Sequence, residues 1–448
     1  MALTRRQALA SIGVLTGWPA AAYGAEPLAA AQDSVAPLTR QDGTVDWTAV
    51  RNLFPLSSEL THLACFLFAP APRPVADAVE RFRQALDSDP LWLEYGTFSE
   101  AEGRPFPAVK EALAAYTGGA ADEIGLMPNT TTALALLYQG LRVRANQHIL
   151  TTEHDHYSHH ESIRYAAARS GCGVEYVSLY DEPAAANAGE MAARIAGAIR
   201  PSTRAVGVTW VHSSTGVKVP VEEIAAMVSE ANRGRDEADR CLLIVDGVHG
   251  FANQDVDIAT LGCDFFASGT HKWLLAPRGT GMLWGRREVW PEITPTIPTF
   301  DPQVPQTWAA WMNRTPLPPT QAAFVSPGGF VAFENLLAIP AATQLHRSIG
   351  RDRIAARIDE LNSAFRTEAS RIPGLRLHTP IDPAVAGPIS CFEVAGLAPS
   401  AVAERLFERG IRTNSSPYKV SYARVSAGIM NSAEDIDRVV RELRNLAM

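Results

Sequence analysis

The chain lacks an excess of basic residues. Its 448 residues carry 40 Lys and Arg against 48 Asp and Glu, which gives a formal net charge of −8. Proteins that bind nucleic acids gather positive charge on one face, and no basic stripe is present in this sequence. The composition therefore disfavours a nucleic-acid partner and fits a mildly acidic, well-solvated surface.

Cysteine is also scarce. The five cysteines are Cys65, Cys172, Cys241, Cys263 and Cys391. Their number is odd and their spacing matches no metal-ligand motif, so we expect no metal site. A chain of this length can bury a sizeable core, which excludes a small fold that depends on disulfides. Because Cys241 and Cys391 lie in strand-like apolar runs, we expect buried thiols.

Long hydrophobic runs are missing as well, since the apolar stretch at 8–22 is too short to span a bilayer. It follows Arg5 and Arg6 in "TRRQALA" and precedes small residues at 20–25 where a peptidase could cut. This pattern predicts a signal peptide of the twin-arginine type and export to the periplasm through the twin-arginine translocase. A helix that carries two chance arginines is the alternative interpretation.

Strand-like and helix-like segments alternate from about residue 120. Apolar strand-like runs begin at 148, 173, 203 and 241, and an amphipathic helix-like run at 221–233 lies between two of them. This alternation predicts an α/β fold with a largely parallel sheet covered by helices. An α+β unit is expected to follow, with one long helix over 344–370.

These segments divide the chain into expected units. We expect a signal peptide at 1–30, an N-terminal arm at 31–75, a large domain at 76–326 and a small C-terminal domain at 327–448.

Two polar residues stand where the carboxyl ends of strands would lie, which is where active sites of such sheets are found. Lys272 lies in an apolar segment of "DFFASGTHKWLLAPRGTG" at 264–281, and Asp246 ends the apolar run in "IVDGVHGF". A desolvated lysine has a lowered pKa and attacks carbonyl carbons. A buried carboxylate can hold a pyridinium nitrogen. The alternatives are a solvated lysine and a turn or cap aspartate.

Two further motifs point to a planar, phosphorylated cofactor. In "MPNTTTALALLYQGL", Asn129 and the threonines at 130–132 precede a helix-like run, where they could cap the helix or bind a phosphate. In "TTEHDHYSHHES", histidines stand at 154, 156, 159 and 160. Their spacing matches no known zinc pattern, and an aromatic stacking partner for a cofactor ring is the favoured interpretation.

Together these motifs resemble the class V aminotransferases, pyridoxal-phosphate (PLP) enzymes of fold-type I. That group includes cysteine desulfurases, kynureninase and isopenicillin N epimerase-like proteins. The resemblance covers about residues 45–445 and is sharpest in "VDGVHG" and "SGTHKWLLAPRGTG". It implies an aspartate aminotransferase-like large domain with a mainly parallel seven-stranded sheet, PLP as cofactor and a homodimer.

The resemblance also implies roles for individual residues. Lys272 would form the imine with PLP and carry protons, and Asp246 would pair with the pyridine nitrogen. His249 would approach the ring hydroxyl, and His156 would stack on the ring, with His154 as the alternative. The implied phosphate-binding set is Asn129, Thr130, Thr131, Ser268, Thr270, His271 and Thr280. Of these, Thr280 would reach the phosphate of the neighbouring subunit.

A last motif, "SYARVSAGIMNSAEDID", resembles the C-terminal motif of the group and contains Arg424. Its guanidinium fork would clamp the substrate carboxylate, and a surface ion pair is the alternative. The preceding loop, "GIRTNSSPYKVSYAR", carries Ser415 and Ser416 where cysteine desulfurases have a nucleophilic cysteine. Sulfur transfer through a persulfide is therefore disfavoured.

The resemblance leaves the reaction open, because PLP labilises bonds at the α-carbon and the protein decides which one breaks. We expect transamination or oxidative modification of an amino acid, or of one linked to a peptide or siderophore. The chain's organisation is similar to that of twin-arginine-exported periplasmic PLP enzymes that modify the siderophore pyoverdine. An isopenicillin N epimerase-like racemase, a C–S lyase and a non-catalytic ligand-binding protein are the alternatives. A nicotinamide-dependent dehydrogenase is disfavoured, because no G-x-G-x-x-G follows a first strand.

Overall fold

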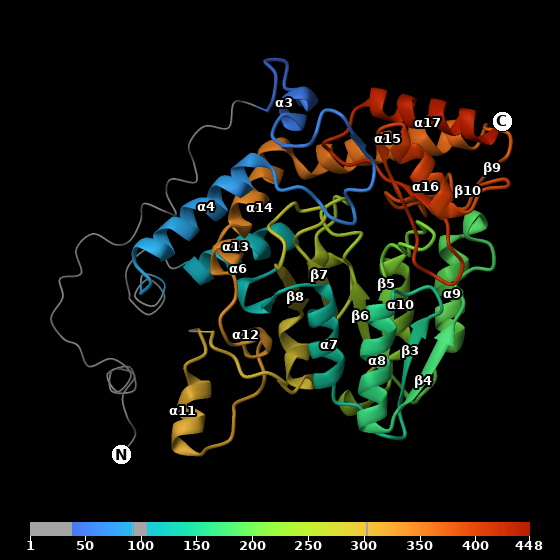
Figure 1. Ribbon diagram of the computed structural model, residues 1–448. Coiled ribbons are helices and arrows are strands. Elements are labelled where there is room, and N and C mark those ends of the chain that lie inside the picture. Colours follow the sequence, from blue (N-terminus) through green and yellow to red (C-terminus); the bar gives the residue numbers. More distant parts are fainter. Residues whose placement is uncertain (1–37, 92, 94–104, 302) are drawn as a thin grey trace.

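The computed structural model describes residues 38–91, 93, 105–301 and 303–448 (Figure 1). The predicted signal peptide at 1–30 and the first residues of the predicted N-terminal arm lie outside the described residues. Within the described part of the chain, no helix combines the length and apolar character that a membrane span needs.

The large sheet has seven strands in the order β2-β8-β7-β6-β5-β3-β4. Their bounds are β2 Ile124–Met127, β3 His148–Thr152, β4 Gly173–Val177, β5 Thr203–Thr209, β6 Leu242–Asp246, β7 Phe265–Gly269 and β8 Gly281–Gly285. The pairs are parallel except that β8 runs antiparallel to both β2 and β7. The predicted α/β fold with a mainly parallel seven-stranded sheet is confirmed.

Strand β6 shows why this sequence forms a buried parallel sheet. Its apolar residues are fully buried, and successive side chains point to opposite faces. Leu242 and Ile244 share a core with helices α7 (Thr130–Gly140) and α8 (Tyr157–Ser170), which lie in front of the strands in Figure 1. Leu243 and Val245 share the opposite core with α9 (Ala188–Ala198) and α10 (Val221–Ala231). A continuous apolar run therefore serves both faces.

A second, four-stranded sheet lies towards the C-terminus. Its strands are β9 Leu375–Leu377, β10 Ser390–Val394, β12 Asn414–Ser415 and β13 Ala423–Val425, all paired antiparallel. It shares a core with α15 (Arg351–Ala369), α16 (Pro399–Glu408) and α17 (Ala433–Ala447). Strand β1 (Thr61–His62) pairs in parallel with β11 (Ile411–Arg412), so the N-terminal segment is attached to this unit.

The expectation of one long helix over 344–370 is wrong. The segment forms α14 (Ile339–Ile349) and α15, separated by Gly350. Gly350 has φ of +106°, a conformation that interrupts a right-handed helix and that residues with a Cβ rarely adopt. The apolar periodicity on both sides of this glycine hides the break.

The remaining α-helices lie before β2 or between β8 and α14 in the sequence. They are α3 Trp47–Arg51, α4 Arg73–Ser88, α6 Pro105–Thr117, α11 Gln306–Asn313, α12 Ala322–Val325 and α13 Phe333–Leu337. Helices α13 and α14 pack on α4 and α6, which precede the sheet in the sequence. The domain boundary near residue 327 stays a prediction.

Candidate active site

The carboxyl ends of the parallel strands bring the predicted residues to one edge of the sheet. Asp246 ends β6, Lys272 follows the neighbouring strand β7, and His156 follows β3. In the strand order, β7 lies on one side of β6, and β5 and then β3 lie on the other. Asp246 therefore stands between Lys272 and His156 along this edge. Burial lowers the pKa of His156, and the positive charge of Lys272 adds to this shift.

Asp246 is a buried carboxyl group at the end of β6, 1% exposed. Its Oδ1 accepts a hydrogen bond from Val248 N at 3.1 Å. Burial raises the pKa of Asp246 to about 7, although this hydrogen bond and the Lys272 charge act in the opposite direction. A carboxylate in such surroundings is stabilised by an adjacent positive charge, and a protonated pyridine nitrogen is such a charge.

Lys272 and His249 form a hydrogen-bonded pair, with 3.1 Å between Nζ and Nε2. Burial lowers the pKa of Lys272 to about 8, so part of the amine is neutral near neutral pH. Burial and the Lys272 charge hold the pKa of His249 well below its ordinary value, which keeps the imidazole neutral. The neutral form of a lysine is the nucleophile, and this site supplies it.

The turn after Lys272 is strained. Leu275 is a buried residue with φ of +63°, and its N–H donates to the Lys272 carbonyl oxygen at 3.2 Å. A branched side chain keeps a left-handed conformation only where the surroundings fix it, and such positions gather at functional sites. The turn therefore fixes the backbone conformation at Lys272.

The N-terminus of α7 meets β7 and β8 at the phosphate-binding positions predicted from the sequence. Asn129 caps the helix, since its Oδ1 accepts from Thr132 N at 2.8 Å. Thr130 Oγ1 accepts from Gly269 N at 2.7 Å, and Thr131 is exposed. A Cβ on Gly281 would lie 2.9 Å from Ser268 O and 3.1 Å from Asn129 Cα, so only glycine permits this approach. The result is a helix N-terminus with hydroxyl groups around it, which suits an anion.

The other predicted phosphate residues are close by but engaged with one another. Thr270 Oγ1 lies 2.6 Å from Thr280 Oγ1, and His271 Nδ1 lies 3.3 Å from Thr280 O. Ser268 Oγ donates to Gly269 O at 3.0 Å. Thr280 is 1% exposed and its hydroxyl is occupied within its own subunit. Its reach to a neighbouring subunit stays a prediction, without support from this geometry.

The structure separates the two histidines proposed for ring stacking. His154 is stacked on Tyr180, with 3.9 Å between ring centroids and 14° between planes, and it accepts from Leu179 N. His156 caps α8 by accepting from Ser158 N at 3.2 Å. Because His154 already stacks on the Tyr180 ring, the geometry favours His156 for the stacking role.

The four histidines of this segment do not converge on one point. His159 pairs with the Tyr138 hydroxyl at 2.7 Å, and His160 with the Thr152 carbonyl oxygen at 2.7 Å. Across the described residues, no group of three or more His, Cys, Asp or Glu is placed to hold a metal ion.

Arg424, on β13, is 3% exposed, and its guanidinium donates to oxygen atoms of three residues. The acceptors are Ser213 O at 2.8 Å, Asn414 Oδ1 at 3.2 Å and Ser415 O at 3.3 Å. The group lies 5.0 Å from the centre of the Phe66 ring. Among the described residues no carboxylate forms an ion pair with it, so its charge is available to a substrate. The same Phe66 ring lies 5.8 Å, between ring centroids, from His249, which contacts Lys272, so Arg424 belongs to the same site.

Comparison with known proteins now identifies the family. The profile of the aminotransferase class-V family matches residues 69–439. The chain belongs to the class-V aminotransferases. The resemblance found in the sequence motifs is thereby confirmed, and so is PLP as the cofactor.

Relatives of this class-V aminotransferase are named after different reactions. It is 28% identical over 419 residues to isopenicillin N epimerase of Streptomyces clavuligerus, which covers 89% of this chain and 98% of that protein. It is 24% identical over 417 residues to a probable cysteine desulfurase of Xylella fastidiosa strain 9a5c, which covers 89% and 95%. The family is clear, and the specific reaction is not fixed by these relatives.

Solved structures support the fold. The structure of the cystine C–S lyase C-DES in complex with cysteine persulfide aligns with a TM-score of 0.74 and 20% identity, over 88% of this chain and 99% of that one. A cysteine desulfurase from Thermococcus onnurineus aligns with a TM-score of 0.73 and 19% identity, over 89% and 98%.

The site residues of this class-V enzyme fit PLP. The carboxylate of Asp246 accepts a hydrogen bond from Val248 N at Oδ1 and can accept another from a protonated ring nitrogen. His249 Nδ1 is a buried atom without a hydrogen-bond partner among the described residues. Gly281 opens the approach to the α7 N-terminus, where a phosphate group would be held. The cofactor would thus lie along the strand ends with Lys272 beside it.

Asp155 also belongs to this edge of the sheet, although it was not among the predicted residues. This carboxylate is 3% exposed and accepts from Thr152 N at 2.8 Å and from Thr209 N at 2.7 Å. It therefore ties the end of β3 to the end of β5, immediately before His156. An acidic residue between two histidines in "EHDHY" was the available signal.

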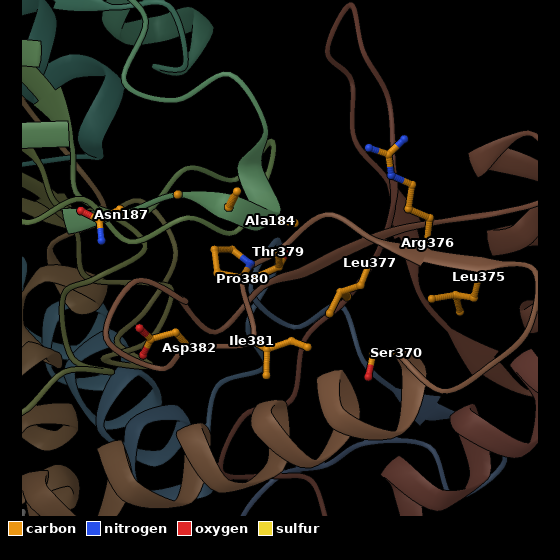
Figure 2. A pocket seen from close by; sticks show the side chains of 12 residues that line it. Ala184, Asn187, Ser370, Leu375, Arg376, Leu377, Thr379, Pro380, Ile381 and Asp382 are labelled. Carbon is orange, nitrogen blue, oxygen red and sulfur yellow. The ribbon is translucent and has the colours of Figure 1, made fainter. Parts of the chain in front are cut away.

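Two hollows differ in their relation to this site. A small one beside Lys272 is lined by Cys65, Phe66, Trp273 and Met430, among others. A wider one, shown in Figure 2, lies between segment 184–187 and segment 375–382. None of the predicted site residues lines the wider hollow, and Arg376 at its edge pairs with Glu182 at 3.0 Å. The chemistry therefore belongs to the strand ends.

Proposed function

We propose that this enzyme removes the α-proton of a substrate that carries an amino group and a carboxylate on the same carbon. The observation that carries this proposal is the Lys272–His249 pair, with a lysine whose pKa burial lowers to about 8, and the guanidinium of Arg424 on the other side of the Phe66 ring that His249 contacts. The substrate class is an amino acid, or an amino-acid residue at the end of a peptide or siderophore.

Each residue has a separate task in this proposal. PLP, when bound, withdraws electrons from the α-carbon and so makes its proton removable. Asp246 holds the charge of the ring nitrogen, and Arg424 binds the carboxylate in a forked geometry. Lys272, as a neutral amine, would take the α-proton and return it. His156 would stack on the ring and exclude water from it.

Sulfur transfer through a protein thiol is not part of the proposal. Cys65 and Cys391 are the cysteines close to Lys272 and Arg424, and both are buried. Burial raises the pKa of each thiol to about 12, which suppresses the thiolate. The loop before Arg424 carries serines instead.

The proton's destination decides between two reactions. If the proton does not return to the α-carbon, the result is transamination. Transamination and oxidative modification are the reactions expected from the sequence. Return to the α-carbon from the other side gives epimerisation. The 28% identity with isopenicillin N epimerase favours epimerisation as the second candidate. A C–S lyase, and a protein that only binds ligands, remain alternatives that turnover measurements would separate.

Arg424→Ala is expected to leave the yellow colour of bound PLP intact and to weaken amino-acid binding about 10- to 100-fold, since a charged hydrogen bond contributes about 1.5–3 kcal/mol. The measurement is a titration of amino acids against the cofactor spectrum. Arg424→Lys, which keeps the charge without the fork, should fall in between. Arg412→Ala, at an exposed arginine on β11, serves as control. Loss of PLP from the Arg424 variants would show that the residue has been assigned the wrong role.

We also propose that the enzyme works in the periplasm after export through the twin-arginine pathway. This route carries folded proteins, so the enzyme could cross with PLP already bound, and the modification of an exported siderophore such as pyoverdine would explain the location. Joint replacement of Arg5 and Arg6 by lysine should leave active, PLP-loaded protein in the cytoplasm. Undiminished export of that variant, measured by cell fractionation, would contradict the proposal.

A homodimer is proposed as the working form. Large apolar side chains are exposed on α11 and the segments around it, including Trp311 at 72% and Phe330 at 94%. Exposed apolar patches of this kind mark protein interfaces. Sedimentation at the monomer mass would refute the dimer.

A further inference from the structure

The loop between β12 and β13 turns one aromatic side chain into the active site. Pro417, Lys419 and Val420 of this loop are exposed, whereas Tyr418 between them is partly buried. Its hydroxyl lies 2.6 Å from Ser213 Oγ. Its ring meets His156 edge-on, with 6.2 Å between centroids and 83° between planes. The proposed function assigns no role to this phenol.

Tyr418 and Arg424, the proposed carboxylate clamp, both contact Ser213. The carbonyl oxygen of Ser213 accepts from Arg424 Nη1 at 2.8 Å, while the hydroxyl of the same residue contacts Tyr418. Ser213 therefore holds a guanidinium with one atom and a phenol with another. The carboxylate clamp and the phenol therefore meet at the same residue, Ser213.

Strand order places Tyr418 and Lys272 on opposite sides of Asp246. Lys272 follows β7, next to β6. Tyr418 contacts Ser213, which follows β5, and His156, which follows β3, and both of these strands lie beyond β6 on the other side. An amine and a phenol therefore flank Asp246 along this edge of the sheet.

The phenol is in the right form to give a proton. Burial raises the pKa of Tyr418, so it stays protonated at neutral pH. The Arg424 charge and the Ser213 hydrogen bond act in the opposite direction, because they stabilise the phenolate once the proton has left. Because these two neighbours stabilise the phenolate, the phenol can give up its proton and regain one afterwards.

We propose that Tyr418 is the second proton carrier of the site and serves the substrate face opposite Lys272. The Lys272 amine takes the α-proton from one face, and the C–H electron pair stays with the substrate. Tyr418 O–H then gives its proton to the α-carbon from the other face, which forms a new C–H bond and leaves a phenolate. Water reprotonates the phenolate and takes the proton from the Lys272 ammonium. This inference rests on the proposed function and selects epimerisation among its outcomes.

Deuterium exchange with each enantiomer tests the inference. The PLP-loaded wild type is incubated in D2O with L- and D-glutamate and with L- and D-alanine, and α-deuteration is followed by mass spectrometry. We expect wild type to deuterate both enantiomers of at least one of these amino acids. Tyr418→Phe should keep the rate for one enantiomer and lose at least ~100-fold for the other, as expected for loss of a general acid–base group.

Further measurements separate a proton carrier from a packing residue. PLP titration into the cofactor-free protein should be the same for wild type and Tyr418→Phe, because phenylalanine keeps the edge contact with His156, and thermal unfolding should shift by no more than the loss of the one hydrogen bond to Ser213 Oγ. Tyr422→Phe is the matched control, since Tyr422 stacks on His378 in the small unit and should exchange as wild type does. Ser213→Ala keeps the Arg424 contact with the backbone and should slow the same enantiomer by a smaller factor.

Two results would overturn the inference. One is a Tyr418→Phe variant that deuterates both enantiomers within about 3-fold of wild type. The other is a wild type that exchanges one enantiomer alone. A wild type that binds PLP but deuterates none of these amino acids would instead count against the proposed function.

Discussion

Lys272→Ala is expected to abolish turnover and to remove the yellow absorption near ~420 nm that PLP shows when bound to a lysine. The purified wild type should be yellow and the variant colourless after dialysis. In the proposed function Lys272 supplies both the covalent attachment and the proton carrier, so we expect a loss of at least ~10³-fold in kcat. Absorbance and a single-turnover assay measure the two effects separately.

The matched control for this variant is Lys218→Ala. Lys218 is also a partly buried lysine whose pKa burial lowers, but it contacts Gln254 at 3.2 Å, and the charges that act on it are those of Asp359, Arg366 and Asp382 rather than Asp246 and Arg424. It should keep both colour and turnover. A Lys272→Ala protein that stays yellow after dialysis, or a Lys218→Ala protein that loses its colour, would show that the attachment site has been misplaced.

Asp246→Asn is expected to lower kcat by about 100- to 1000-fold, because it removes a preorganised charge from the position where the ring nitrogen must stay protonated. Lys272 remains, so PLP should still attach and the protein should stay yellow. Equal losses of colour and turnover would mean that Asp246 serves attachment rather than electron withdrawal. The same variant also has an effect on stability that does not involve the cofactor.

In the PLP-free protein, the pKa of Asp246 is about 7, above its ordinary value of 3.8. Between about pH 4 and 7 the folded state therefore binds more protons than the unfolded state, and the Asp246 contribution to the unfolding free energy falls as pH rises. The asparagine of the Asp246→Asn variant has no proton to lose. Urea unfolding should thus show the variant gaining stability relative to wild type from about pH 4 to pH 7, and parallel pH curves would contradict the assigned burial.

Several parts of the fold follow from local sequence. The runs at 205–208 and 242–245 contain no polar side chain, which is typical of strands buried on both faces, and the structure places both near the centre of the sheet. The helix over 344–370 was predicted wrongly, because the apolar periodicity continues across Gly350 and only the backbone angle reveals the break. The antiparallel course of β8 likewise depends on pairing with β2, a strand distant in the sequence.

Some residues of the site can likewise be predicted from local sequence, and others cannot. Lys272, Asp246 and the α7 N-terminus each lie directly after a strand or before a helix, so their placement follows from local pattern. His154 and His156 are two residues apart, and only the stacking of His154 on Tyr180 distinguishes them. Tyr418 could not be found from the sequence, because its inward direction depends on Ser213, which is distant in the chain.

The most direct test of the proposed chemistry is whether the PLP-loaded wild type exchanges the α-proton of its substrate for deuterium. The enzyme is incubated in D2O with a panel of amino acids and with a peptide that begins with glutamate, and products are analysed by mass spectrometry. We predict a yellow protein and the mass gain of one deuterium at the α-carbon of at least one panel member, lost in Lys272→Ala. A protein that stays colourless with added PLP, or a yellow protein that deuterates no member of the panel, would contradict this chemistry.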